Sequence, residues 1–174
     1  MVVPSQPGQF ATVSTFPNGV RTYFPFNGTI QKIESVSTPT NPSGFSTWNN
    51  IGTLAEFGVT DVAQQSAIAG VGYLSPQTGA LIQRLFYQTT NGDIRTVFHP
   101  GITGEPGFLI DPTIIASNVP LGTPISAMQQ ASPGLGQPVS CFYTTVFHDA
   151  SAHRTSRKLS LYSGPMQVVS LTRG

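Results

Sequence analysis

Residues 20–31 read Val-Arg-Thr-Tyr-Phe-Pro-Phe-Asn-Gly-Thr-Ile-Gln, and residues 83–95 read Gln-Arg-Leu-Phe-Tyr-Gln-Thr-Thr-Asn-Gly-Asp-Ile-Arg. Both stretches contain an arginine, a pair of aromatic residues, an Asn-Gly dipeptide and an isoleucine that begins a second apolar run. Asn-Gly between two β-type runs predicts a β-hairpin, because a type I′ turn needs positive φ at both central residues. A hairpin that occurs twice in one chain indicates a repeat architecture.

Alignment of the two hairpins divides the chain into three similar units, about residues 10–60, 66–118 and 120–174. Arg21 and Arg84 occupy the same place in the first two units, and Ser140 occupies it in the third. Each unit is predicted to contain four strands. The predicted strands are Phe10–Phe16, Val20–Phe26, Thr29–Val36 and Phe45–Ile51; Ala67–Leu74, Leu81–Thr89, Asp93–His99 and Phe108–Ile115; and Thr123–Gln130, Val139–His148, Lys158–Ser163 and Met166–Leu171.

A four-stranded unit that repeats along a chain predicts the blades of a β-propeller. Closed propellers typically have about 4–8 blades, so three blades do not close a ring. We therefore expect residues 1–174 to form a single all-β domain that associates with a second copy into a six-bladed ring. The alternative is a single β-sandwich that contains two similar hairpins.

The composition favours a protein with a substantial core and few electrostatic partners. Hydrophobic residues make up 39% of the chain, charged residues only 9%, and the net charge is +1. Nothing in this balance indicates a nucleic-acid partner. No apolar run approaches the ~20 residues that span a membrane, and the first residues lack the basic and apolar segments of a signal peptide. We expect a soluble protein, either cytoplasmic or secreted without a visible signal peptide.

The chemistry-bearing residues do not predict an enzyme. The single cysteine, Cys141, excludes an intrachain disulfide and is expected to be a small buried residue. No nucleophile motif and no evident pair of catalytic carboxylates occurs. The polar stretch Asp149–Ser156 is predicted to be a loop, and the nearby His148 and His153 have no third ligand at a recognised metal-site spacing. We expect no catalysis, no metal and no cofactor.

Four stretches carry a resemblance to a known family. The sequence Ser66-Ala-Ile-Ala-Gly-Val-Gly-Tyr, followed by residues 82–95, resembles a blade of the fungal fucose-specific lectins. Residues 120–127 are similar to the family's entry into a new blade, and Trp48-Asn-Asn-Ile-Gly-Thr-Leu is similar to its outer strand. The resemblance implies a six-bladed propeller, in some members assembled from short chains, with sugars bound in pockets between blades.

The resemblance also implies a set of sugar-binding residues: an arginine on the second strand, a glutamate on the third and aromatic residues from a neighbouring blade. The arginine becomes Arg21 and Arg84. The glutamate position falls on Lys32 in the first unit and on Thr96 in the second. Glu34 shares a strand face with Lys32, so we expect it to replace the glutamate only if the register slips by two residues.

Aromatic residues complete the expected site, with Trp48 as the outer-strand tryptophan and Phe108 as its nearest equivalent in the second unit. Arginine offers a rigid fork of donors to sugar oxygens, glutamate accepts from hydroxyls, and an aromatic face covers the apolar side of a sugar. Further possible platforms are Tyr23 and Phe86. The expected sugar-binding residues are Arg21, Glu34, Trp48, Arg84, Tyr87 and Phe108.

Two functions are compatible with these residues. The first is a carbohydrate-binding lectin that recognises fucosylated or similar glycans, and it is favoured by Arg21, Arg84 and Trp48. The alternative is a structural or protein-interaction module that kept the scaffold and lost its sugar sites. Thr96 at the glutamate position and Ser140 at the arginine position favour this alternative.

Overall fold

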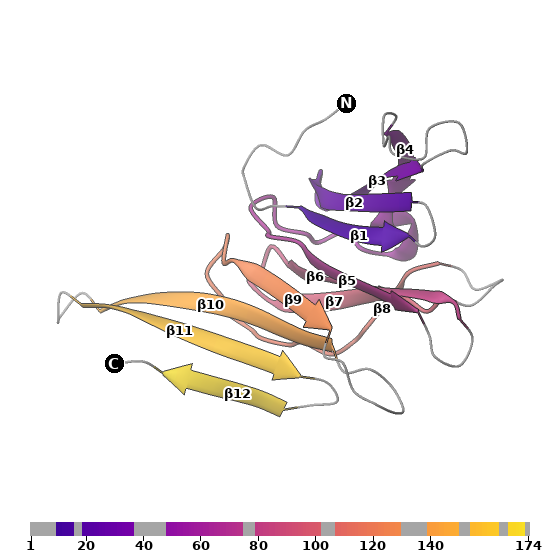
Figure 1. The fold of residues 1–174 in the computed structure, drawn as a ribbon. Helices are drawn as coiled ribbons and strands as arrows, with labels where there is room; N and C mark the ends of the chain where they lie inside the picture. The colour runs from indigo at the N-terminus through magenta and orange to yellow at the C-terminus, as the bar shows by residue number, and fades with distance from the viewer. Residues whose placement is uncertain are drawn as a thin grey trace.

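The computed structural model describes residues 10–15, 19–36, 48–74, 79–101, 107–129, 139–149, 154–163 and 167–172. Their strands form three four-stranded sheets, and each sheet is built from strands that follow one another in the chain (Figure 1). The first sheet contains β1 (Ala11–Thr15), β2 (Gly19–Phe26), β3 (Thr29–Val36) and β4 (Asn49–Thr53). The second contains β5 (Ala69–Leu74), β6 (Leu81–Gln88), β7 (Ile94–His99) and β8 (Leu109–Ile110). The third contains β9 (Ile125–Gln129), β10 (Val139–Asp149), β11 (Arg154–Ser163) and β12 (Gln167–Thr172).

The first strands of the three sheets lie side by side at the centre of the molecule. Strand β1 contacts β5, and β5 contacts β9 (Figure 1). Together the three strands and the residues beside them line a hollow of about 220 Å³. The hollow is lined by Phe10, Ala11, Thr12, Ile68, Ala69, Gly70, Ile125, Ser126 and Ala127. The sheets are therefore arranged around a common axis like the blades of a propeller, and we call them blades 1, 2 and 3.

The core consists of the two layers between neighbouring blades. Along β6, Leu85 and Tyr87 belong to the cluster shared with blade 1, whereas Phe86 between them belongs to the cluster shared with blade 3. Successive side chains of a strand point to opposite faces of its sheet, so both faces of blade 2 are buried. Apolar area removed from water on both faces stabilises the stack of blades.

Two glycines allow β5 to approach β1 closely. A Cβ atom on Gly72 would lie 2.3 Å from Cγ1 of Val13, and one on Gly70 would lie 3.0 Å from Cγ2 of Val13 and 2.9 Å from Cδ2 of Leu85 on β6. Real Cβ atoms do not approach so closely, so these positions have room only for glycine unless their neighbours move. Small residues at the inner strands let the blades converge towards the axis.

The two Asn-Gly hairpins differ. In the first, Asn27 has φ 48° and Gly28 has φ 76°, which confirms the predicted type I′ turn. In the second, Gly92 has φ 82° but Asn91 does not have positive φ, so the prediction of a type I′ turn there is wrong. The longer second loop is closed by bonds from the Thr89 amide to the Asp93 carbonyl and from the Gly92 amide to the Thr89 carbonyl, 2.8 and 3.0 Å long.

Both hairpins are tied to the segment that leads into the next blade. The Gly28 carbonyl accepts a hydrogen bond from the Val62 amide at 2.9 Å, and the Gly92 carbonyl accepts one from the Val119 amide at 2.8 Å. The second connection is reinforced by Gln88, which is fully buried. Its Nε2 donates to the carbonyls of Val119 and Pro120, and its Oε1 accepts from the Gly122 amide.

Most predicted strands agree with the structure, but three predictions need correction. The fourth strand of the second unit was predicted at Phe108–Ile115 and is only Leu109–Ile110. The chain turns directly after it, because Pro112 has no N–H and the Asp111 carboxylate accepts from the Thr113 amide at 3.0 Å. The expected strand Phe45–Ile51 begins and ends later, at Asn49–Thr53, and residues 45–47 lie outside the described residues. A short 3-10 helix, η1 (Leu54–Phe57), follows it.

The third correction concerns the polar stretch Asp149–Ser156, which was predicted to be a loop. Strand β10 continues to Asp149 and β11 begins at Arg154, where the two residues pair, so the prediction is wrong for residues 149 and 154–156, and residues 150–153 lie outside the described residues. The register of β9 and β10 pairs Met128 with Ser140, as Val13 pairs with Arg21 and Val71 with Arg84. The backbone register therefore supports the alignment of the three units. No helix in the described ranges is both long enough and apolar enough to cross a membrane.

Candidate functional site

An ion pair lies at the junction of blades 1 and 2. Arg21 on β2 and Glu34 on β3 are direct register partners. The Arg21 Nε donates to the Glu34 Oε1 at 2.8 Å, and the two side chains are 30% and 21% exposed. The expectation that Glu34 could meet the arginine only after a register slip of two residues is wrong. The two-residue turn pairs Phe26 with Thr29, and pairing outward from it puts Glu34 opposite Arg21.

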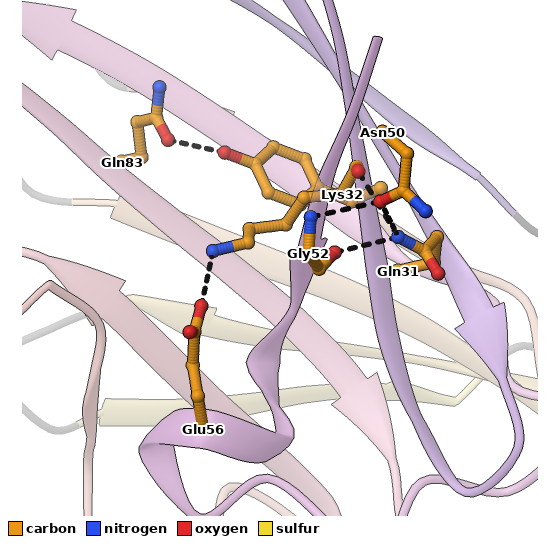
Figure 2. Close-up of polar contacts among 7 residues, drawn as sticks. Gln31, Lys32, Asn50, Gly52, Glu56 and Gln83 are labelled. Atoms are coloured by element: carbon orange, nitrogen blue, oxygen red, sulfur yellow. Dashed lines mark hydrogen bonds and ion pairs between the residues drawn. The ribbon is translucent and has the colours of Figure 1, made fainter.

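The row beside this pair connects the two blades. Tyr23 follows Arg21 on the same face of β2, and its hydroxyl donates to the Gln83 Oε1 of blade 2 at 2.5 Å (Figure 2). Burial raises the pKa of Tyr23, and the neighbouring Arg21 offsets part of that effect. Gln83 is only 1% exposed, and its Nε2 has no hydrogen-bond partner among the described residues. The junction therefore contains a buried amide donor that no other described residue satisfies.

Lys32 is the register partner of Tyr23 and lies on the same face. Its side chain leaves β3 towards η1, where Nζ lies 2.7 Å from the Glu56 Oε1 (Figure 2). The ammonium also lies over the Phe57 ring, 5.0 Å from its centroid. The Lys32 side chain is 11% exposed, whereas that of Glu56 is 54% exposed. Thus a largely covered cation is held by a carboxylate that is mostly in solvent.

His99 belongs to the same junction, and sequence reasoning did not assign it to the site. It is the register partner of Gln83 on blade 2, and its Nδ1 accepts a hydrogen bond from the Gly101 amide at 3.0 Å. Burial lowers the pKa of His99, and the charges of Arg21 and Lys32 lower it further. The ring is therefore neutral at pH 7, and its proton lies on Nε2 because Nδ1 acts as an acceptor. The register of β6 with β7 is the signal that would have found it.

The predicted aromatic residues have different environments. Phe108 of blade 2 packs in the junction, with ring centroids 6.0 Å from Tyr23 and 5.4 Å from His99. It is only 4% exposed, so it supports the site from below. Tyr87 is 1% exposed within the same core and presents no free ring face; burial raises the pKa of its hydroxyl to about 12. Trp48 is half-buried just before β4, and in the described part of the chain no ring or cation contact joins it to Arg21.

Arg84 has a different setting at the junction of blades 2 and 3. It shares a face of β6 with Phe86, which packs towards blade 3. Its register partner on β7 is Phe98 rather than an acid, and the guanidinium lies over that ring, 5.3 Å from the centroid. The nearest carboxylate comes from Asp111 after β8, whose Oδ2 lies 3.7 Å from the Arg84 Nη1. The Arg84 Nε is buried and has no partner among the described residues.

No family model matches this chain, and no characterised protein compared with it is significantly similar in sequence. Solved structures share its fold. The AofleA protein of Arthrobotrys oligospora superposes with a TM-score of 0.59 at 16% identity, over 94% of this chain and 45% of that chain. A variant of AofleA with three arginines replaced by alanine gives a TM-score of 0.64 at 15% identity, over 97% of this chain and 45% of that chain.

The lectin of Aleuria aurantia, a six-bladed β-propeller with a distinctive fucose recognition mode, superposes with a TM-score of 0.61 at 16% identity. The alignment covers 93% of this chain and 47% of the lectin. The chain has a β-propeller fold. It spans a little under half the length of these proteins, so its three blades correspond to about half a propeller. The predicted propeller and the likeness to fungal fucose lectins are thus confirmed for the fold, and the sandwich alternative is wrong.

Proposed function

We propose that this chain binds carbohydrate without catalysis, with its principal sugar site at the junction of blades 1 and 2. The observation that carries the proposal is the Arg21–Glu34 pair, in which donors and acceptors lie side by side and partly exposed. Arginine can donate to ring and hydroxyl oxygens while glutamate accepts from neighbouring hydroxyls. A buried aromatic floor of Tyr23 and Phe108 keeps both side chains at the surface.

Fucose or a related sugar is the proposed ligand. The Aleuria aurantia lectin, which shares the fold, recognises fucose, and the paired arginine and glutamate suit the hydroxyls of such a pyranose. The absence of catalysis is supported by four of the described carboxylates, because Glu34, Glu56, Asp93 and Asp111 each lie within 4 Å of a cationic side chain. Paired carboxylates of this kind are poorly suited to general acid or base chemistry.

A second copy of the chain is the proposed partner that completes a six-bladed ring, because three blades leave the propeller open. Arg84 then provides a further site at the junction of blades 2 and 3. Where two copies meet, the register position of the arginine in blade 3 is Ser140. A ring of two copies therefore has two arginine-bearing junctions in each copy and an arginine-free junction wherever the copies meet. Several sites on one ring increase the avidity for glycan-coated surfaces.

The test is calorimetric titration of the purified protein with fucosides and related monosaccharides, with its mass in solution measured by light scattering. We expect a mass twice that of the chain, and an affinity that falls at least about tenfold for Arg21→Ala and for Glu34→Gln at the first site. The matched control is Arg95→Ala, because Arg95 is also half-exposed and lies 3.7 Å from Asp93. A folded protein that binds none of the sugars on a full glycan array contradicts the proposal.

A protein-interaction module is the second candidate. It is favoured by Thr96, which stands where the resemblance places a glutamate and is buried with its hydroxyl bonded to the Leu85 carbonyl at 3.0 Å. Phe98 opposite Arg84 favours it as well. A ring that assembles but leaves every glycan unbound would support this candidate.

A further inference from the structure

Two neighbouring rows of side chains face blade 2 from the same surface of blade 1. Arg21 and Glu34 form one row, and Tyr23 and Lys32 form the next. Residues two apart on a strand lie about 6.5–7 Å from each other. A sugar ring held by the first row therefore places its substituents within reach of the second row, where Lys32 carries a positive charge.

The surroundings of the second row are rich in unused hydrogen-bond donors. Gln83 is 1% exposed and its Nε2 has no partner among the described residues. His99 carries its proton on Nε2, because its Nδ1 accepts from the Gly101 amide. Lys32 has three N–H donors, of which the structure shows one directed to Glu56. A group that fits this environment must be mainly an acceptor.

The charges favour the same kind of group. Arg21 and Lys32 both act on His99 and lower its pKa, so two cations approach one ring from the two rows. Glu34 accepts from the Nε of Arg21 at 2.8 Å, while Glu56 is the carboxylate that pairs with Lys32 among the described residues. Glu56 lies on the single turn of η1 and is 54% exposed. Its carboxylate is therefore placed where the carboxylate of a ligand could replace it with little loss of buried contact.

We propose that the junction of blades 1 and 2 selects a sugar that carries a carboxylate, bound by Lys32 with Gln83 and His99 as additional donors. This inference rests on the proposed function and names the ligand class of the same site. Arg21 and Glu34 hold the hydroxyls of the ring, and Lys32 holds the acidic group. Charge-assisted hydrogen bonds are the strongest that such a site can form, so a sugar with an acidic group binds more tightly than its neutral counterpart.

The experiment compares sugars that differ in the acidic group: galacturonic acid with galactose, and glucuronic acid with glucose. Each is titrated calorimetrically into the purified protein at low and at high salt. We expect the acidic member of each pair to bind at least about tenfold more tightly at low salt, with the preference reduced at high salt. Equal binding of the two members overturns the inference.

Variants then assign the preference to one residue. Lys32→Gln should abolish the preference for the acidic member of each pair, whereas Lys32→Arg should keep it. Glu56→Gln removes the internal competitor and should increase affinity for the acidic sugars severalfold. Arg95→Gln is the control, because it removes a similar cation on the other blade of the same junction. A Lys32→Gln protein that keeps the preference overturns the inference.

The two proposals fail in different ways. If the wild-type protein binds neutral sugars alone, the proposed function stands and the inference about acidic sugars is overturned. If it binds neither member of either pair nor any fucoside, both are overturned.

Discussion

The two described blade junctions place an arginine at the same register position but give it different partners. Arg21 donates to Glu34 across the same sheet at 2.8 Å. Arg84 lies over Phe98, and its nearest carboxylate, on Asp111, is 3.7 Å away beyond the short strand β8. The repeated hairpin preserves the place of the arginine, while the third and fourth strands determine what the arginine meets. Repeated backbone geometry therefore does not guarantee repeated binding chemistry.

The same junctions are also held together differently. At the first, Gly70 and Gly72 bring β5 close to the side chain of Val13. At the second, Gln88 bonds three backbone groups of the connecting segment. The residue that corresponds to Gln88 in blade 1 is Pro25, whose ring has no hydrogen-bonding group. The first junction thus depends on close apolar packing, and the second also depends on a buried polar side chain.

The largest expected effect is that of Gln88→Leu. The substitution removes the partner of the Val119 carbonyl at a buried position, and the partners of the Pro120 carbonyl and the Gly122 amide at part-buried positions. We expect the free energy of unfolding, measured by urea denaturation, to fall by about 2–4 kcal/mol. Gln65→Leu, at an exposed position, is the control. Equal effects of the two substitutions would mean that Gln88 does not hold the junction of blades 2 and 3.

A smaller effect distinguishes the two hairpins. Gly28 and Gly92 both have positive φ, but a Cβ on Gly28 would lie 3.4 Å from the Thr60 carbonyl oxygen. A Cβ on Gly92 would lie only 2.7 Å from the Val119 carbonyl oxygen. We expect Gly28→Ala to lower the free energy of unfolding by about 1 kcal/mol, from strain at positive φ. Gly92→Ala should cost about 2–3 kcal/mol, because the backbone of the next segment must also move. If urea denaturation gave the same loss of unfolding free energy for both substitutions, the two glycines would have the same room beside the segment that leads into the next blade.

The smallest effect is a dependence of stability on pH at the first junction. His99 has a pKa below its ordinary value of 6.5 in the folded protein, so the unfolded chain takes up its proton first as the pH falls. The stability that comes from the neutral ring is fully present above pH 6.5 and is lost as the pH falls from there through the folded pKa. His99→Gln should make the melting temperature depend less on pH between about 7 and 5. If the melting temperature of the variant changed with pH as much as that of the wild type, the titrating group would be another residue of the chain.

The sequence predicted the hairpins, the four-stranded units and the arginine positions because these depend on local signals. Asn27 and Gly28 specify their turn, and alternation specifies the strands beside it. The pairing of Arg21 with Glu34 was also accessible, since it follows from counting outward from a two-residue turn. That count, rather than the resemblance to other blades, identifies the acid that pairs with Arg21.

The remaining features depend on how blades pack on one another, which local patterns do not specify. Tyr87 alternates with Phe86 on a strand that is covered on both faces, so neither ring is a free platform. His99 approaches Arg21 and Lys32 only because blade 2 packs against blade 1. Asp111 reaches Arg84 because the chain turns directly after Ile110. Each of these contacts joins residues from different strands or different blades.

Each sheet is built from strands that follow one another in the chain, and this arrangement has a consequence for synthesis on the ribosome. No described strand waits for a partner from the far end of the chain, so each blade can assemble as soon as its own four strands have emerged. The hairpin of blade 1 gains its bond to Val62 only when the first residues beyond that blade arrive, and the hairpin of blade 2 likewise waits for Val119. The molecule is thus suited to vectorial folding, in which every newly made segment completes the blade before it.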